Sequence, residues 1–382
     1  MIAVSRPLAS RWRVALGAMA LLGLACAALA EGGVPPSPPA LSPGEAEFRA
    51  GWVAFAEPIR KPGSERTAEA RQHAREAAIP HLEAAVAAAP RNATYQSSLA
   101  YICLTAGKYD KALAAINQAV DLERGDPLLY LLRGQAEAAI AQLNPEEAAT
   151  RMGPAMTAFS RAAELDPKNA LPLLQAASVA VDVNRADLAL TNLKKALSLP
   201  ECRLYRLPVP EDLGADPASS LNTWEYIQYG HWFGLVARCQ NVADYCRRAG
   251  QEAERKGDLA AAEERYQWVR SVAKFVGAAE PPLFITVNTG IDMLEDAYRN
   301  LARVGKATGS KEAKRWEEEL GICQLGREQL FGALKLYERD VSTGAIASVQ
   351  QSLEAQAKLA SPVIAGAGLG TVDQPPPAKR PQ

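Results

Sequence analysis

The stretch 112-ALAAINQA-119 decides the fold, because its apolar positions return along the chain at a fixed step. Ala112, Ile116 and Ala119 are spaced i, i+4 and i+7, which places them on one stripe of a helix. The same pattern occurs 34 residues earlier in 78-AIPHLEAA-85 and later in 155-AMTAFSRA-162 and 189-ALTNLKKA-196. A period in this range predicts a helical solenoid, in which each unit buries its apolar face against the next.

A partner helix is predicted before each of these stretches. Ala100, Gly134 and Ala177 are small residues that stand where the partner helix must approach the apolar stripe. Turn signals such as Ala106-Gly107-Lys108 separate the two helices, because glycine tolerates a positive φ. Each unit is therefore expected to be a hairpin of two helices.

These hairpins resemble the tetratricopeptide repeat, whose pattern is W-x2-L-G-x2-Y…A-x3-F…P. The matching copies are Gln96-x2-Leu99-Ala100…Ala112-x3-Ile116-x2-Ala119, Tyr130-x2-Arg133-Gly134…Ala155-x3-Phe159-x2-Ala162…Pro167 and Leu173-x2-Ala176-Ala177…Ala189-x3-Leu193-x2-Ala196. The resemblance covers about residues 75–200. It departs from the pattern at Arg133, a usual leucine position, and at Arg124, where a closing proline is expected. It implies an all-α solenoid that holds other proteins.

The chain divides into segments of different composition. The predicted order is a signal peptide or N-terminal anchor (1–30), a proline-rich linker (31–43), the repeat array (44–201), a connector (202–223), a C-terminal helical domain (224–358) and a disordered tail (359–382). The stretch 246–269 reads either as a degenerate repeat or as an ordinary helical hairpin. The stretch 283–287 is the only candidate strand, with a buried loop as the alternative.

The first 30 residues have the layout of a secretory signal. Arg6, Arg11 and Arg13 precede an apolar run from Val14 to Ala30 that ends in a small-x-small triplet. Two alternatives are an uncleaved membrane anchor and a lipoprotein acylated at Cys26. All three readings predict an exported protein, in the bacterial periplasm or the cell envelope.

The sequence offers few groups for chemistry. The 42 basic and 43 acidic residues balance, which argues against a nucleic-acid partner. Three histidines, His73, His81 and His231, stand apart from any metal-binding or catalytic motif. The five cysteines after Cys26 include no C-x-x-C. The prediction is a protein that is not an enzyme and uses no cofactor and no metal.

The resemblance implies a concave groove lined by the first helix of each hairpin. Its predicted wall is Thr94, Ser97, Tyr101, Thr105, Leu128, Leu131, Gln135, Leu171, Leu174 and Ser178. The family's clamp for a C-terminal carboxylate needs Lys, Arg and Asn at several of these positions. The side chains here are hydroxyl, amide and apolar, so the expected ligand is a hydrophobic segment with few charges. The alternative is that some of the leucines pack between adjacent repeats.

Aromatic residues concentrate just after the connector. They are Trp224, Tyr226, Tyr229, Trp232 and Phe233, with His231 among them. Such a cluster forms either a contact patch for a partner or a sugar, or the core of the C-terminal helical unit.

The predicted function is a non-catalytic adaptor in the cell envelope that presents a repeat groove to a protein or peptide. Contact with a membrane is expected only through the N-terminal segment. The alternatives are a protein that binds cell-wall glycan through the aromatic cluster and a structural spacer that associates with itself.

Overall fold

The structure is a computed structural model that describes residues 41–60, 67–143, 148–210, 213, 223–343, 349–367 and 369. The chain divides into two units, Met1–Ser42 and Pro43–Gln382, and all the described helices belong to the second. The expected signal peptide (1–30), Cys26 and nearly all of the expected linker lie outside the described residues.

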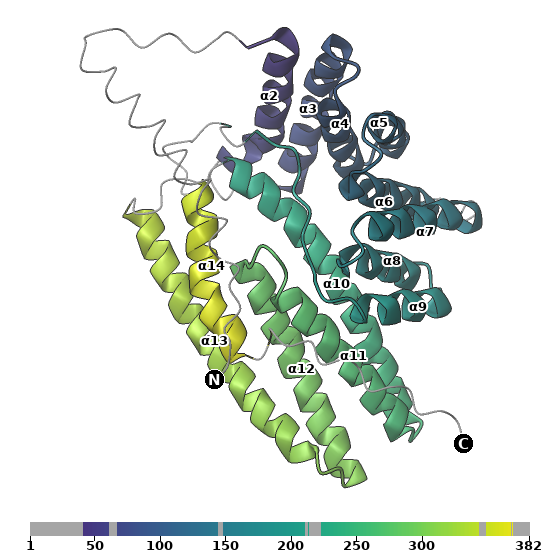
Figure 1. Ribbon diagram of the computed structural model, residues 1–382, viewed down its shortest axis with the longest axis vertical. Coiled ribbons are helices and arrows are strands. Elements are labelled where there is room, and N and C mark those ends of the chain that lie inside the picture. Colours follow the sequence, from purple (N-terminus) through teal and green to yellow (C-terminus); the bar gives the residue numbers. More distant parts are fainter. Residues whose placement is uncertain are drawn as a thin grey trace, which may run out of the picture. The chain divides into compact units, whose positions relative to one another are not determined.

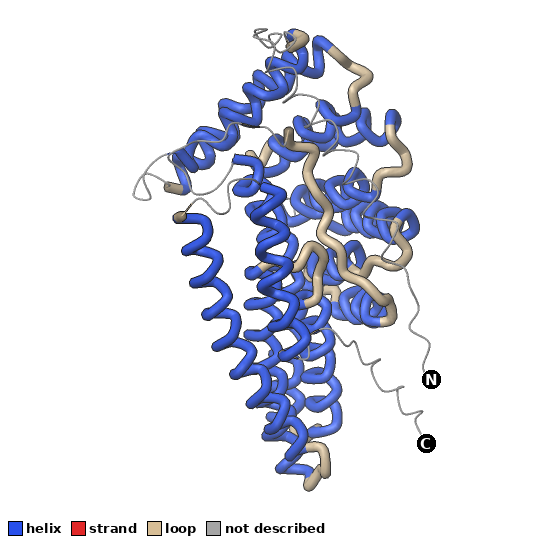
Figure 2. The backbone as a smooth tube through the Cα atoms, turned by 60° about the vertical axis from the view of Figure 1, so that its left-hand side comes forward, coloured by secondary structure: helices blue, strands red, loops and turns tan. Residues whose placement is uncertain are grey.

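The described part of the chain is all α, as the sequence predicts (Figure 2). The N-terminal helices are α2 (Pro43–Ala56), α3 (Ala68–Ala88), α4 (Ala93–Thr105), α5 (Tyr109–Leu122), α6 (Pro127–Leu143), α7 (Ala148–Leu165), α8 (Leu171–Asp182) and α9 (Ala186–Leu197), with a 3-10 turn η2 (Glu57–Arg60) after α2. The C-terminal helices are α10 (Thr223–Arg255), α11 (Leu259–Gly277), α12 (Phe284–Thr308), α13 (Ala313–Ser342) and α14 (Val349–Gly366).

The helices from α2 to α9 pack as four successive hairpins (Figure 1). The apolar positions of all four repeated stretches are at most 1% exposed. Gly134 of α6 lies against the Phe159 ring of α7, so closely that a Cβ would come within 2.7 Å of the ring. The small residues of one helix therefore admit the large residues of the next, and the solenoid prediction is confirmed for these helices.

Local signals place the ends of these helices. The Asn92 side chain accepts a hydrogen bond from the backbone N–H of Tyr95 at 3.2 Å and so caps α4. Gly107 has a φ of 76°, which reverses the chain between α4 and α5. The Asp258 carboxylate caps α11 in the same way, by accepting from the backbone N–H of Ala261 at 3.0 Å.

The connector packs beside α10. The Gln228 side chain accepts from the N–H of Leu207 at 3.0 Å and donates to the carbonyl of the same residue at 2.7 Å. Leu204, Leu207 and Val209 are buried. The part of the connector that the structure describes is thus held against the core although it forms no helix.

Two expectations for the C-terminal half are wrong. The stretch 283–287, a candidate strand or loop, is the start of α12, where the Thr286 hydroxyl accepts from the N–H of Leu283 at 3.2 Å. The tail expected to be disordered from residue 359 continues α14 to Gly366. Val363 is buried, and Leu369 packs against Gly277 of α11, so burial of apolar side chains orders this glycine-rich segment.

The crossing of α11 and α12 is expected to tolerate no side chain at Gly290. A Cβ there would lie 2.6 Å from the Cα of Gly277 and 2.9 Å from the Ala273 carbonyl oxygen, both of them backbone atoms. Gly290→Ala should therefore lower the free energy of unfolding by about 2 kcal/mol. The control is Gly153→Ala in α7, where nothing lies within 4 Å and the change should be neutral or stabilising. Urea denaturation of both variants measures the difference, and equal stabilities would contradict the packing.

Candidate functional site

Helix α10 crosses the concave side of the hairpins (Figure 1). It packs against α8, where the Gln175 side chain donates to the Leu235 carbonyl of α10 at 3.0 Å. Asn241 of α10 donates to the Ser178 hydroxyl at 3.2 Å and to the Asp182 carboxylate at 2.7 Å. The groove that the sequence predicts is therefore closed by the protein's own helix at α8.

A cleft stays open where α10 passes α4 and α6. We call it the central cleft. Its volume is about 650 Å³, and its walls come from α2, η2, α3, α4, α5, α6 and α10. This is the size of a pocket that takes a small molecule or a few residues of a peptide. Its described lining includes residues of α4 and α6, the first helices of their hairpins, and of α10, which lies outside the repeats.

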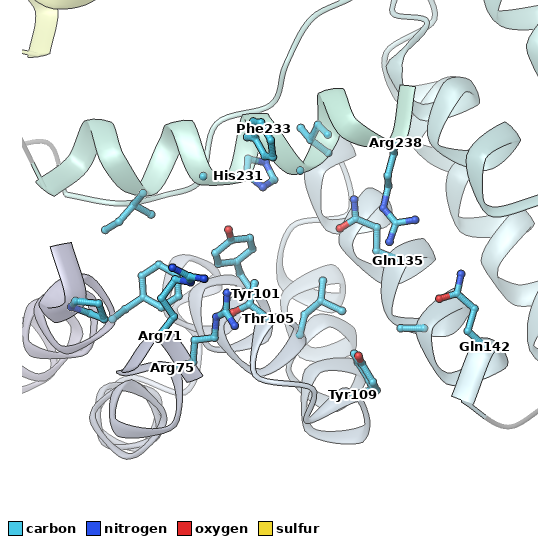
Figure 3. Close-up of a pocket in the computed structure, with 18 residues that line it drawn as sticks. Arg71, Arg75, Tyr101, Thr105, Tyr109, Gln135, Gln142, His231, Phe233 and Arg238 are labelled. Atoms are coloured by element: carbon cyan, nitrogen blue, oxygen red, sulfur yellow. The ribbon is translucent and has the colours of Figure 1, made fainter. Parts of the chain in front are cut away.

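The charged side chains that line the central cleft are all basic. Figure 3 shows Arg71 and Arg75 of α3 at one end, Arg238 of α10 at the other, and Tyr101 and His231 between them. No Asp or Glu is among the described lining residues. Arg238 lies 3.6 Å from the Asp182 carboxylate, which is outside the lining.

Arg75 is the arginine best placed to meet a ligand. It forms no hydrogen bond or ion pair with another described side chain, and it is half-buried. Burial raises the pKa of the Tyr101 hydroxyl, and the nearby Arg75 guanidinium lowers it in part. The guanidinium therefore lies close to the tyrosine at the base of the cleft, where an arginine can bind a carboxylate through two hydrogen bonds.

His231 is a neutral polar group in the cleft wall. It is 5% exposed, and its ring centroid lies 5.4 Å from that of Tyr101 in an edge-to-face contact. Burial lowers its pKa to about 4, with a small opposing effect from a hydrogen bond to the Tyr205 backbone. Its Nε2 is buried without a hydrogen-bond partner among the described residues. Such an atom is costly unless a ligand or water satisfies it.

One face of α10 leaves its backbone open to the cleft. Gly230 and Gly234 line the cleft and are exposed, and a Cβ at either position would meet nothing within 4 Å. Between them, the Phe233 side chain is 56% exposed and also lines the cleft. This arrangement offers a smooth helix surface beside one large apolar side chain.

In the structure, the predicted groove residues do not lie on one surface. Of the ten, Tyr101, Thr105 and Gln135 line the central cleft. Most of the others are buried and leave no surface for a partner: Ser97, Leu128, Leu131, Leu171, Leu174 and Ser178. Thr94, at the start of α4, is half-buried and lies outside the cleft lining. The leucines pack within the hairpins and Ser178 bonds to α10, so as a continuous groove the prediction is wrong.

The aromatic cluster is mainly core. Trp224 is 2% and Trp232 0% exposed, and their rings meet edge to face at 6.3 Å. Tyr229 is half-buried and its hydroxyl accepts a hydrogen bond from Gln356 of α14. The side chain of Tyr226 lies outside the described residues. Among the described side chains of the cluster, only Phe233 offers a large exposed face, and the two buried tryptophans cannot form a sugar-binding patch.

The arginines of the cleft were missed from the sequence. Arg71 and Arg75 are spaced i, i+4 on α3, the second helix of its hairpin, whereas the prediction placed the groove on first helices only. Arg238 lies on α10, outside the repeats. The i, i+4 spacing does show that the first two share a helix face. It does not show that this face borders α10.

The match to a protein-family model agrees with the hairpin geometry. Residues 69–136, from α3 into α6, match the family model of the tetratricopeptide repeat. No curated protein matches the sequence. Among solved structures, the chain is similar to one in the crystal structure of the APC/C hetero-tetramer Cut9-Hcn1, with 14% sequence identity and a TM-score of 0.25. That alignment covers 82% of this chain and 58% of the other, so this chain spans little more than half of its length.

Proposed function

We propose that the tetratricopeptide repeats of this protein and helix α10 together hold a segment of a partner protein in the central cleft. The role is that of a scaffold, and it involves no bond chemistry. The observation that carries the proposal is the cleft itself, an opening of about 650 Å³ between the inner repeat helices and a helix that closes the rest of the concave side. Peptide segments bind in such grooves through a few buried anchors.

The chemistry of the lining favours an acidic segment. Arg71, Arg75 and Arg238 line the cleft without any described carboxylate among them. Hydrogen bonds between arginine and carboxylate are among the strongest that a protein surface can offer. The partner proposed here carries Asp or Glu side chains, unlike the hydrophobic segment with few charges that the sequence suggests.

The apolar part of the lining favours one aliphatic or aromatic anchor beside the carboxylates. Phe233 and Leu104 face the cleft from α10 and α4, and the glycines at 230 and 234 let a backbone or a flat ring approach α10 closely.

The proposal is tested by panning a library of random peptides against the full-length protein. Gly234→Trp places a large side chain in the open cleft and should reduce the binding of the selected peptides at least tenfold, about 1.4 kcal/mol. Gly153→Trp, at an exposed glycine of α7 with nothing within 4 Å, is the matched control and should leave binding unchanged. Peptides that bind both variants equally well would show that the cleft is not the site.

The same peptides test the charge of the ligand. Asp and Glu should be enriched among the peptides whose binding depends on the cleft, and exchanging them for Asn and Gln should weaken binding about tenfold. Arg75→Gln should weaken the acidic peptides to a similar degree and leave the amide versions unaffected. If neutral or basic peptides were enriched instead, the cleft would still be the binding site, but the proposed preference for acidic peptides would be wrong.

Export to the periplasm or cell envelope is part of the proposal and rests on residues 1–30 of the sequence alone. Among the described residues, no helix is both long and apolar enough to cross a membrane. Cell fractionation with N-terminal sequencing of the mature chain tests this part. A mature chain that begins near Glu31 outside the cytoplasm supports it, and an intact chain in the cytoplasm contradicts it.

A further inference from the structure

Helix α13 carries two exposed leucines in a stripe along its outer side, with the polar residues Glu328 and Gln329 between them. Its inner side is buried at seven-residue intervals, by Trp316, Cys323 and Leu330. On the opposite side, Leu325 is 56% and Leu336 44% exposed. Large apolar side chains in line on an exposed helix face are typical of a surface that meets another protein.

Two glycines on the same stripe indicate that a helix approaches closely. Two other helix glycines of this fold receive a large side chain of the next helix, since Gly134 meets the Phe159 ring and Gly250 meets a tyrosine ring, whereas Gly153 of α7 meets nothing within 4 Å. Gly321 and Gly332 of α13 are exposed and meet nothing within 4 Å. An exposed glycine inside a helix destabilises it relative to alanine, so two on one face point to packing made outside this chain.

We propose that α13 pairs in an antiparallel manner with α13 of a second copy of the protein. The two glycines are eleven residues apart, and Leu325 and Leu336 are also eleven residues apart. Under a two-fold axis at the middle of the stripe, each leucine therefore faces a glycine of the second copy. Leu325 lies opposite Gly332, and Leu336 lies opposite Gly321. This surface is self-complementary, as a two-fold interface requires.

The charges on the stripe favour the same register. The antiparallel pairing that matches leucine to glycine brings Glu318 opposite Arg339 of the second copy, twice by symmetry. Both side chains are 64% exposed, and each also forms an exposed ion pair within its own helix, Glu318 with Lys314 and Arg339 with Asp340. A parallel pairing in register would instead place Glu318 against Glu318 and Leu325 against Leu325. Charge pairs of this kind add little affinity but select the orientation.

The test is sedimentation velocity of the full-length protein from about 1 to 100 μM, a range that detects micromolar dimers. The wild type should shift from monomer to dimer as its concentration rises. Leu325→Glu with Leu336→Glu should weaken the dimer at least a hundredfold. Phe331→Glu is the matched control, because Phe331 is 51% exposed on the same helix but lies off the stripe, and it should dimerise like the wild type.

A further variant distinguishes specific pairing from non-specific hydrophobic association. Gly332→Phe makes the surface more apolar while filling the position that Leu325 of the second copy would occupy. Gly332→Phe should weaken the dimer at least tenfold. If the copies associated only through exposed apolar surface, the same substitution would strengthen the association. A wild type that stays monomeric throughout the range, or a dimer that survives the double glutamate variant, would overturn the proposal.

Cysteine crosslinking tests the register. Chains with Leu325→Cys mixed with chains with Gly332→Cys should form a disulfide-linked dimer under mild oxidation, because a disulfide needs Cα atoms within about 7 Å. Either variant alone should crosslink poorly. The five described native cysteines are buried, which limits background crosslinking. Efficient crosslinking of Leu325→Cys with itself would show a parallel pairing and contradict the proposed one.

Discussion

Trp232→Ala is expected to lower the free energy of unfolding by about 3–5 kcal/mol. The Trp232 side chain is fully buried, and its indole N–H donates to the Tyr205 carbonyl at 2.9 Å. Its ring lies edge to face with those of Trp224 and Tyr229. The substitution leaves a large cavity and removes one hydrogen bond to the Tyr205 carbonyl where α10 meets the connector. Guanidinium denaturation followed by circular dichroism measures the loss.

The neighbouring residue provides the control. Phe233 is 56% exposed in the central cleft, so Phe233→Ala should change the free energy of unfolding by less than about 0.5 kcal/mol. It should still weaken a ligand of the cleft. If both variants were equally stable, the aromatic cluster would not be core, and a contact patch built on the tryptophans would return as a hypothesis.

The stability of the protein is expected to fall by about 3 kcal/mol between pH 6.5 and pH 4 through His231 alone. Burial lowers the pKa of His231 from 6.5 to about 4. In this window the unfolded chain binds a proton that the folded chain does not, so acid favours unfolding. The contribution is complete above pH 6.5 and is lost as the pH falls towards 4. Its size follows from the shift of the pKa.

The contribution is isolated by comparing variants, because carboxylates also titrate in acid. His231→Gln should lose about 2 kcal/mol less stability than the wild type between pH 7 and pH 5. His73→Gln replaces an exposed histidine of α3 and serves as the control, and its pH profile should match the wild type. Identical profiles for all three proteins would show that the imidazole of His231 is not buried.

The hairpins could be predicted because their packing depends on the spacing of apolar and small residues along each helix. The stripe of Ala112, Ile116 and Ala119 has to be buried, and the small residue at Gly134 gives the point at which the next helix approaches. Both follow from the geometry of one helix. The start of α12 was missed because its first residues are β-branched and aromatic, and only the hydroxyl of Thr286 favours a helix there.

The central cleft could not be predicted because it depends on where α10 lies. The amphipathic pattern of α10 shows that it buries one face but not which surface covers that face. The polar residues Gln175 and Ser178 inside the apolar helix α8 were the available signal. Only Ser178 was assigned to a groove for an external ligand, whereas the partners of Gln175 and Ser178 are Leu235 and Asn241 of the same chain. The arginines line the two ends of the cleft from helices far apart in sequence.

The most direct test of the central claim is site-specific photo-crosslinking in living cells. A photoreactive amino acid in place of Phe233 should capture a partner protein, and the capture should disappear when Gly234→Trp fills the cleft. The same photoreactive residue in place of Gly153, an exposed position of α7 outside the central cleft, is the control. Capture of one protein from Phe233 alone is the result expected of a scaffold that binds through the cleft. No capture, or the same proteins from both positions, would contradict it.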